Sequence, residues 1–224
     1  MTYPLRARLL CCLALVCLGL PVRAEDWQLM GSEHGIEIYR REVPGSGIVA
    51  LKGTGTIDAP LWKIASILLD TKRAPEWVDS LKESRVLHRL GLNRYVEYNH
   101  IGGPLVMKDR DFVSDVAIEV DARAKTFALI YKPTDDPDVP ASRHVRGEII
   151  SGVFRATSLG KDAPTELTAE LHCDPRGALP KWVVNLFQKN WPRNTLEAIR
   201  TQAVKPDIAM PDQFKDVLAP TRQF

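Results

Sequence analysis

Three polar residues that alternate along one predicted strand are the side chains best placed to contact a ligand. Tyr95, Glu97 and Asn99 are spaced by two, so they share one face of an extended segment. An isolated buried carboxylate is costly, and Glu97 must therefore find a hydrogen-bond partner or take up a proton. We interpret the three as a polar patch that orients a ligand hydroxyl or amine. The alternative is a structural acid that pairs with a nearby Arg or Tyr or faces solvent.

The other titratable side chains form no recognisable catalytic or metal site. His172 and Cys173 are neighbours that point to opposite faces of a strand, so they cannot share a metal ion. No two of the five histidines lie at metal-ligand spacing; they are His34, His88, His100, His144 and His172. The sequence also lacks a nucleophile elbow, a phosphate-binding loop and a dinucleotide fingerprint. We therefore expect no metal, no cofactor and no catalytic residue.

The first 24 residues have the pattern of a cleaved signal peptide. Arg6 and Arg8 precede an uncharged apolar run, Leu9 to Leu20, which is shorter than the roughly 20 residues that cross a bilayer. Small residues up to Ala24 provide a cleavage site. We predict a signal peptide over residues 1–24 and a mature protein that is periplasmic or secreted.

Removal of this segment changes the charge and the cysteine content of the chain. The formal net charge of the whole chain is +2, and the segment holds three arginines and no acid, which leaves −1. No basic surface field is then expected, so we predict no nucleic acid partner. Cys173 is the one cysteine of the four outside the segment, so the mature chain cannot form an internal disulfide.

Alternating apolar and polar residues predict a sheet that is dry on one face. Strands are expected over residues 36–41, 48–57, 84–90, 94–101, 112–120, 126–131, 144–150, 153–158 and 166–172. The short, turn-rich gaps between them indicate antiparallel neighbours. A helix is expected after Pro60, over residues 61–69.

A long C-terminal helix is the element best able to cover the dry face of this sheet. It opens at Leu179-Pro180 and is expected to run to about Ala203, with a kink at Pro192 and a tail over residues 206–224. The apolar face of the sheet and this helix together predict an enclosed interior. The residues expected to line it are Phe112, Ser114, Val116, Ile118, Leu167, Val184, Phe187 and Trp191.

The order of these elements and three motifs resemble the START family of lipid-transfer domains. The motifs are the strand opening Arg110-Asp111-Phe112-Val113, a loop over residues 133–146, and Leu179-Pro180 followed by Asn185. The resemblance extends from about Trp27 to Gln202. It implies an α+β helix-grip (START/Bet v 1-like) fold, with a curved antiparallel sheet around a C-terminal helix and an internal hydrophobic cavity. We expect this lipid-binding domain over residues 25–205.

The resemblance also assigns two positions in the cavity wall. Cholesterol-binding members of the family carry a Glu and an Arg there; Glu97 matches the Glu position, but Val116 stands at the Arg position. Sterol specificity therefore does not transfer to this chain through that residue pair.

These features predict a monomeric carrier of one hydrophobic molecule, a lipid or a sterol-like compound. Its partners would be that molecule and, transiently, a membrane. Two alternatives remain open from the sequence. One is a cavity enzyme of the cyclase or hydrolase type on the same fold, and the other is a ligand-sensing interaction module.

Overall fold

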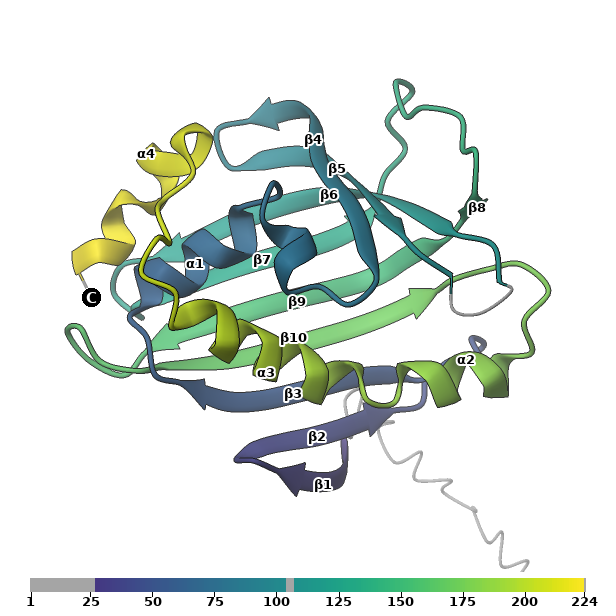
Figure 1. Cartoon of the computed structure of the whole chain (residues 1–224), viewed down its shortest axis with the longest axis horizontal. Coiled ribbons are helices and arrows are strands. Elements are labelled where there is room, and N and C mark those ends of the chain that lie inside the picture. The colour runs from purple at the N-terminus through teal and green to yellow at the C-terminus, as the bar shows by residue number, and fades with distance from the viewer. Residues whose placement is uncertain (1–26, 104–106, 224) are drawn as a thin grey trace, which may run out of the picture.

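A curved antiparallel sheet dominates the protein, as the computed structural model shows for residues 27–103 and 107–223 (Figure 1). In this part of the chain ten strands form one sheet in the order β1-β2-β3-β10-β9-β7-β6-β5-β4, with β8 paired to β6 off this path. The strands are β1 (Gln28–Glu33), β2 (Ile36–Arg41), β3 (Ala50–Ile57), β4 (Leu81–Gly91), β5 (Arg94–Ile101), β6 (Arg110–Asp121), β7 (Thr126–Pro133), β8 (Val145–Arg146), β9 (Glu148–Ser158) and β10 (Thr165–Asp174). The expected fold class is confirmed. The predicted signal peptide lies outside the described residues.

Helices cover one face of the sheet (Figure 1). They are α1 (Leu61–Leu69), α2 (Lys181–Gln188), α3 (Trp191–Ala203) and α4 (Lys215–Leu218), with short 3-10 turns η1 (Ala74–Glu76), η2 (Asp212–Phe214) and η3 (Ala219–Gln223). Within the described residues, no helix combines the length and the hydropathy required to span a membrane.

The main core lies between α1, α3 and the covered face of the sheet. Leu61 and Ile64 of α1 and Ile199 of α3 are fully buried there. They pack in one cluster with strand residues such as Val116 and Leu167, whose neighbours along each strand point the other way. The alternation in the sequence therefore identifies the buried face correctly.

The C-terminal helix is two helices rather than one kinked helix. Helix α2 ends at Gln188 and α3 begins at Trp191, so Pro192 occupies the first turn of the second helix. Proline is well tolerated there because a first-turn N–H has no partner inside the helix. At Gly53 a Cβ atom would lie 2.8 Å from the Pro192 Cβ, so this glycine lets α3 rest directly on β3.

Three other elements differ from the sequence expectation. Strand β1 was not expected, because its side chains are mostly exposed and carry little alternation. Residues 148–158 form one strand, since β9 runs through Gly152, which pairs with Leu171 of β10 and Tyr131 of β7. The segment expected as a tail packs against the core.

This last segment holds four buried side chains: Met210, Phe214, Leu218 and Thr221. The Phe214 ring lies 5.1 Å from the ring of Tyr95, measured between centroids. In this segment Met210, Phe214 and Leu218 are spaced by four. Three prolines and the shortness of the turns obscured this spacing in the sequence.

Candidate functional site

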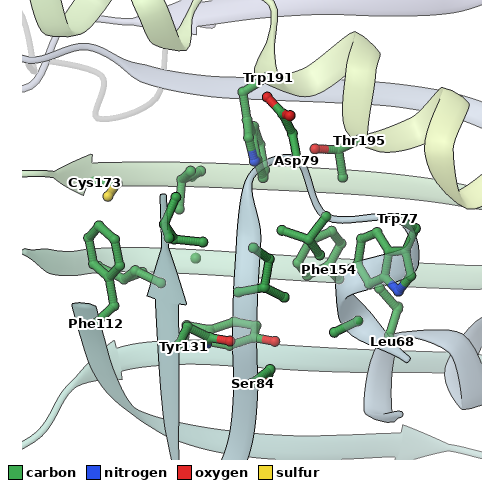
Figure 2. Close-up of a pocket in the computed structure, with 18 of the residues that line it drawn as sticks. Leu68, Trp77, Asp79, Ser84, Phe112, Tyr131, Phe154, Cys173, Trp191 and Thr195 are labelled. Carbon is green, nitrogen blue, oxygen red and sulfur yellow. The ribbon is translucent and has the colours of Figure 1, made fainter. Parts of the chain in front are cut away.

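A pocket of about 350 Å³ opens between the covered face of the sheet and the helices (Figure 2). Its walls come from β4, β5, β6, β7, β9 and β10, from α1 and the segment around η1, and from the α2–α3 junction. Most of the lining is apolar, and it includes Leu68, Trp77, Leu81, Ile101, Phe112, Ile149, Phe154, Leu171, Phe187 and Trp191. A volume near the lower end of the roughly 300–1,000 Å³ typical of ligand sites fits a compact hydrophobic molecule.

Aromatic rings form one wall of the pocket from the sheet to the helix. The centroids of Tyr131 and Phe154 are 6.3 Å apart, and those of Phe154 and Trp191 are also 6.3 Å apart. Figure 2 shows these rings around the same space as Leu68 and Trp77. Such a wall offers a large apolar contact area with few side-chain torsions to order.

Glu97 is the buried carboxyl of the pocket. It is 5 % exposed, and its Oε1 accepts a hydrogen bond from Asn99 Nδ2 at 2.6 Å. Burial raises the pKa of Glu97 to about 7, although Asn99 and Tyr95 act in the opposite direction. Near neutral pH a large share of the carboxyl is therefore protonated, and it can then both donate and accept a hydrogen bond.

No cation of the described residues contributes to the pKa of Glu97. Val116, at the position where the resemblance implies an Arg, is buried in the main core. Ser114 lies opposite Glu97 in the β5–β6 register, and its buried hydroxyl has no hydrogen-bond partner in the described part of the chain. Among the described residues, no Arg pairs with Glu97. The hydrogen bond from Asn99 instead supports the interpretation that Glu97 pairs with polar neighbours.

Tyr131 adds a third polar group, beside Glu97 and Asn99, to this end of the pocket. Burial and the charge of Glu97 both raise the pKa of its phenol well above the ordinary value. The hydroxyl therefore stays protonated and remains a hydrogen-bond donor. The pocket combines apolar walls with a small polar end made by Glu97, Asn99 and Tyr131.

The residues expected from the sequence to line the interior divide into two groups. Those that line the pocket are Glu97, Asn99, Phe112, Phe187 and Trp191. Those that lie outside its lining are Tyr95, Ser114, Val116, Ile118, Leu167 and Val184, all of which are buried. The strand pleat predicts which face is covered, but it does not predict which end of that face α1 fills.

Several lining residues were not expected from the sequence. Trp77 and Asp79 come from the irregular segment after α1, and Thr195 comes from α3 (Figure 2). Tyr131 and Phe154 lie on β7 and β9, where apolar residues such as Ile130 and Val153 occupy the opposite face, so alternation does not single them out. The segment around Trp77 has no periodic pattern from which its position could have been predicted.

The sequence of this chain matches a known protein family. The START domain profile matches residues 8–204 of the chain. The chain belongs to the START domain family. The resemblance noted from the motifs is therefore confirmed, and START domains bind lipids or other hydrophobic ligands.

START relatives occur in bacteria and in animals. An uncharacterised protein of Pseudomonas aeruginosa is 28 % identical, with coverage of 81 % of this chain and 89 % of that protein. The human phosphatidylcholine transfer protein is 26 % identical, with coverage of 77 % and 81 %. The rat steroidogenic acute regulatory protein is 29 % identical; the match covers 75 % of this chain but 60 % of that protein.

Solved START structures share the fold. Human STARD10 superposes with a TM-score of 0.74 at 22 % identity, covering 88 % of this chain and 79 % of that one. A STAR-related lipid transfer protein from Xanthomonas axonopodis superposes with a TM-score of 0.69 at 21 % identity, covering 81 % and 100 %. These START structures agree with the sheet and helix arrangement described above.

Proposed function

We propose that this START protein binds one lipid or sterol-like molecule in the pocket and carries or presents it without chemical change. The observation that supports this most directly is a mainly apolar pocket of about 350 Å³ with a buried carboxyl, Glu97, whose pKa is raised to about 7. Apolar surface contributes about 25 cal/mol for each Å² removed from water, so shape and burial can supply most of the affinity. The lipid-transfer names of its relatives point the same way.

The polar end of the pocket would orient the ligand. Glu97, Asn99 and Tyr131 can together donate to and accept from a hydroxyl or a small polar headgroup. A compact ligand with one polar end fits a pocket of about 350 Å³ that has one polar end. We therefore favour a sterol-like or single-chain lipid as the ligand.

Helix α2 would be the entrance. Phe187 lines the pocket yet is 53 % exposed, so it separates the interior from solvent. Val184 is the one α2 residue that is fully buried. The break between Gln188 and Trp191 would let α2 move while α3 stays packed on β3.

An apolar surface on α2 would contact the donor or acceptor membrane. Trp182 and Leu186 are 69 % and 50 % exposed and lie one helical turn apart, beside Phe187. Trp is favoured at membrane interfaces because one end of its ring system is apolar and the other is polar. A membrane at this face would meet the entrance directly.

The proposal extends to location and assembly. A monomer exported by the predicted signal peptide would work in the periplasm or outside the cell, and its core rather than a disulfide would hold it folded. N-terminal sequencing of the protein from its own host tests this. A protein that still begins at Met1 and is recovered from the cytoplasmic fraction would contradict export.

Lipid analysis of the purified protein is the first test of function. Native mass spectrometry should show one bound hydrophobic molecule, and Phe187→Asp should weaken binding of a fluorescent sterol or lipid. Vesicle-to-vesicle transfer distinguishes a carrier from a sensor, since a sensor binds without accelerating transfer. If neither the native protein nor added lipids give a complex, the proposal is wrong.

A cavity enzyme is the second candidate, favoured by one observation. A carboxyl with a pKa raised to about 7 inside a cleft is typical of acid–base catalysis. However, burial raises the pKa of the pocket thiol Cys173 to about 12, which leaves that thiol a poor nucleophile. An enzyme of this kind would lose turnover but keep ligand binding in Glu97→Gln.

A further inference from the structure

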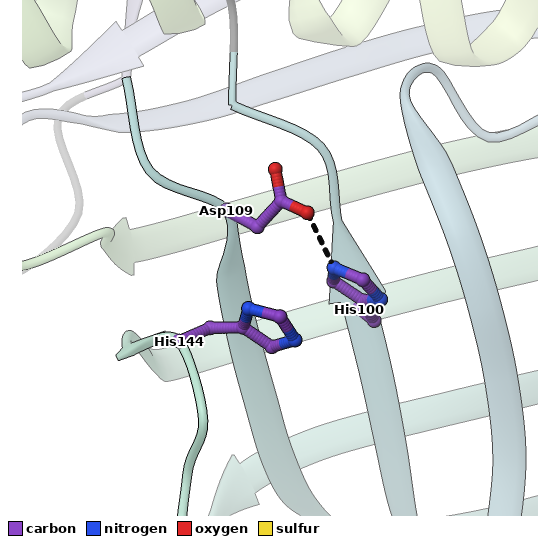
Figure 3. Close-up of side chains that lie close together, drawn as sticks. All are labelled: His100, Asp109 and His144. Atoms are coloured by element: carbon purple, nitrogen blue, oxygen red, sulfur yellow. Dashed lines mark hydrogen bonds and ion pairs between the residues drawn. The ribbon is translucent and has the colours of Figure 1, made fainter. Parts of the chain in front are cut away.

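Two histidines and an aspartate meet on the side of the sheet away from the pocket (Figure 3). His100 lies on β5 between Asn99 and Ile101, which both line the pocket, so its ring points to the opposite face. Asp109 directly precedes β6, and His144 directly precedes β8. Three segments that are separate in the sequence therefore contribute to one cluster.

The three side chains are close enough to share one ion. His100 Nε2 lies 2.8 Å from Asp109 Oδ2, and the two imidazole rings are stacked with centroids 4.1 Å apart and planes 14° from parallel. One ligand atom from each residue can be chosen so that all three lie within 4.8 Å of one another. Metal–ligand bonds of about 2.1 Å bring ligand atoms within about 4.2 Å. Because a metal ion lies in the plane of each imidazole that binds it, one ring would have to turn out of the stack to close the site.

We propose that His100, Asp109 and His144 bind a divalent transition-metal ion of the zinc type. Two imidazoles and a carboxylate are ligands that such ions prefer, whereas calcium and magnesium prefer oxygen ligands throughout. Three protein ligands leave a coordination position for water. No metal motif marks the site in the sequence, because the two histidines belong to different elements and their spacing matches none.

Asp109 is held in place, but it already has a competing cation. Its Oδ1 accepts a hydrogen bond from the Gly103 N–H at 3.0 Å, which fixes the carboxylate. Lys82 Nζ lies 2.8 Å from Oδ2, the same atom that contacts His100. The Lys82 side chain is 55 % exposed and can move into solvent, so a metal ion could displace it. The displacement would lower the affinity of the site for the ion.

Metal binding would fasten the loop that precedes β8 to the sheet. Polar contacts hold other points of this region: His88 is hydrogen-bonded to Asp136 at 2.6 Å, and Arg146 forms an ion pair with Asp111 at 2.9 Å. A shared ion would add a direct link from His144 to β5. This role concerns the face opposite the pocket, so it does not depend on the proposed lipid ligand.

Calorimetric titration of the EDTA-treated protein with Zn²⁺ tests the site. We expect saturable binding of one equivalent, a higher melting temperature, and slower proteolysis of the loop before β8. His144→Gln should weaken Zn²⁺ binding at least tenfold, since loss of a supporting contact alone costs about ten- to a hundredfold. The matched control is His34→Gln, which removes an exposed histidine 2.5 Å from the Glu197 carboxylate with no second histidine in the pair.

A second variant tests the site in the opposite direction. Lys82→Met removes the competing cation and should tighten Zn²⁺ binding several-fold, with unchanged circular dichroism. The proposal is overturned if Zn²⁺ shows no saturable binding, if His144→Gln and His34→Gln behave alike, or if Lys82→Met weakens binding.

Discussion

Glu97 is a buried acid with polar neighbours, and no cation among residues 27–103 and 107–223 stabilises its charge. Burial raises its pKa from the ordinary value of 4.5 to about 7. The folded protein therefore binds the proton more tightly than the unfolded chain does. The resulting stability is fully present below pH 4.5 and is lost as the pH rises through 7.

Replacement of this carboxyl by an amide should remove that pH dependence. From pH 5 to pH 8 the wild type should lose on the order of 2 kcal/mol of its free energy of unfolding, and Glu97→Gln should not lose it. Urea unfolding at both pH values measures the change. The matched control is Glu119→Gln, which removes an exposed carboxyl from β6. Removal of the loss by both variants alike would show that burial of Glu97 is not the cause.

Gly53 is a second position where a change of one atom should alter the stability of the fold. Gly53→Ala would place a Cβ 2.8 Å from the Pro192 ring, close to the backbone of α3. We expect a loss of about 1–3 kcal/mol in free energy of unfolding, the usual cost of overpacking. Gly31→Ala on β1 is the control, because its Cβ would meet nothing within 4 Å. Thermal or urea unfolding of both variants measures the difference. Equal stabilities would contradict the close approach of Pro192 to Gly53.

At the scale of elements, a few polar contacts hold α2 to the connection before β3 and to β10. Asn185 makes two of them: its Oδ1 accepts from the Val49 N–H at 3.1 Å, and its Nδ2 donates to the Gly47 carbonyl at 3.2 Å. Gln188 adds a third, through Nε2 to the Cys173 carbonyl at 3.2 Å. These bonds lie at the proposed entrance.

Loss of the Asn185 contacts should speed ligand exchange. Each of the two hydrogen bonds contributes about 1 kcal/mol, so Asn185→Ala should raise the release rate of a fluorescent lipid roughly thirtyfold. Stopped-flow fluorescence with acceptor vesicles measures that rate. Lys189→Ala, at an exposed position next to the end of α2, is the control and should leave the rate unchanged. A release rate insensitive to Asn185 would place the entrance elsewhere.

The sequence predicts elements better than it predicts their ends and contacts. Strand β5 was expected with its observed bounds, because its alternation is strong and turns flank it. The division of residues 179–203 into two helices was not expected, since Pro192 predicts a disturbance but does not fix the residue where one helix ends. The pocket could be predicted only in part, because Glu97 shares its face with Tyr95, and tertiary packing decides which of them faces the pocket.

At the scale of the whole molecule, the apolar surface of α2 lies next to the pocket. If a membrane docks there, Trp182→Asp should slow vesicle-to-vesicle transfer several-fold while equilibrium binding of a soluble fluorescent ligand stays the same. Leu92→Asp changes an equally exposed apolar residue, 70 % exposed in the β4–β5 connection, and serves as the control. Equal slowing by both variants would contradict docking through α2.

Strand β3 pairs on one side with β2 and on the other with β10, whose first residue, Thr165, is the partner of Ile57. The centre of the sheet thus joins segments more than a hundred residues apart, and such long-range pairing makes folding slow. Phe214 and Leu218, which complete the core, follow every strand of the sheet in the sequence. The core can therefore close only after the distant strands have paired and the segment after α3 has packed against them, which makes the final packing a late event in folding.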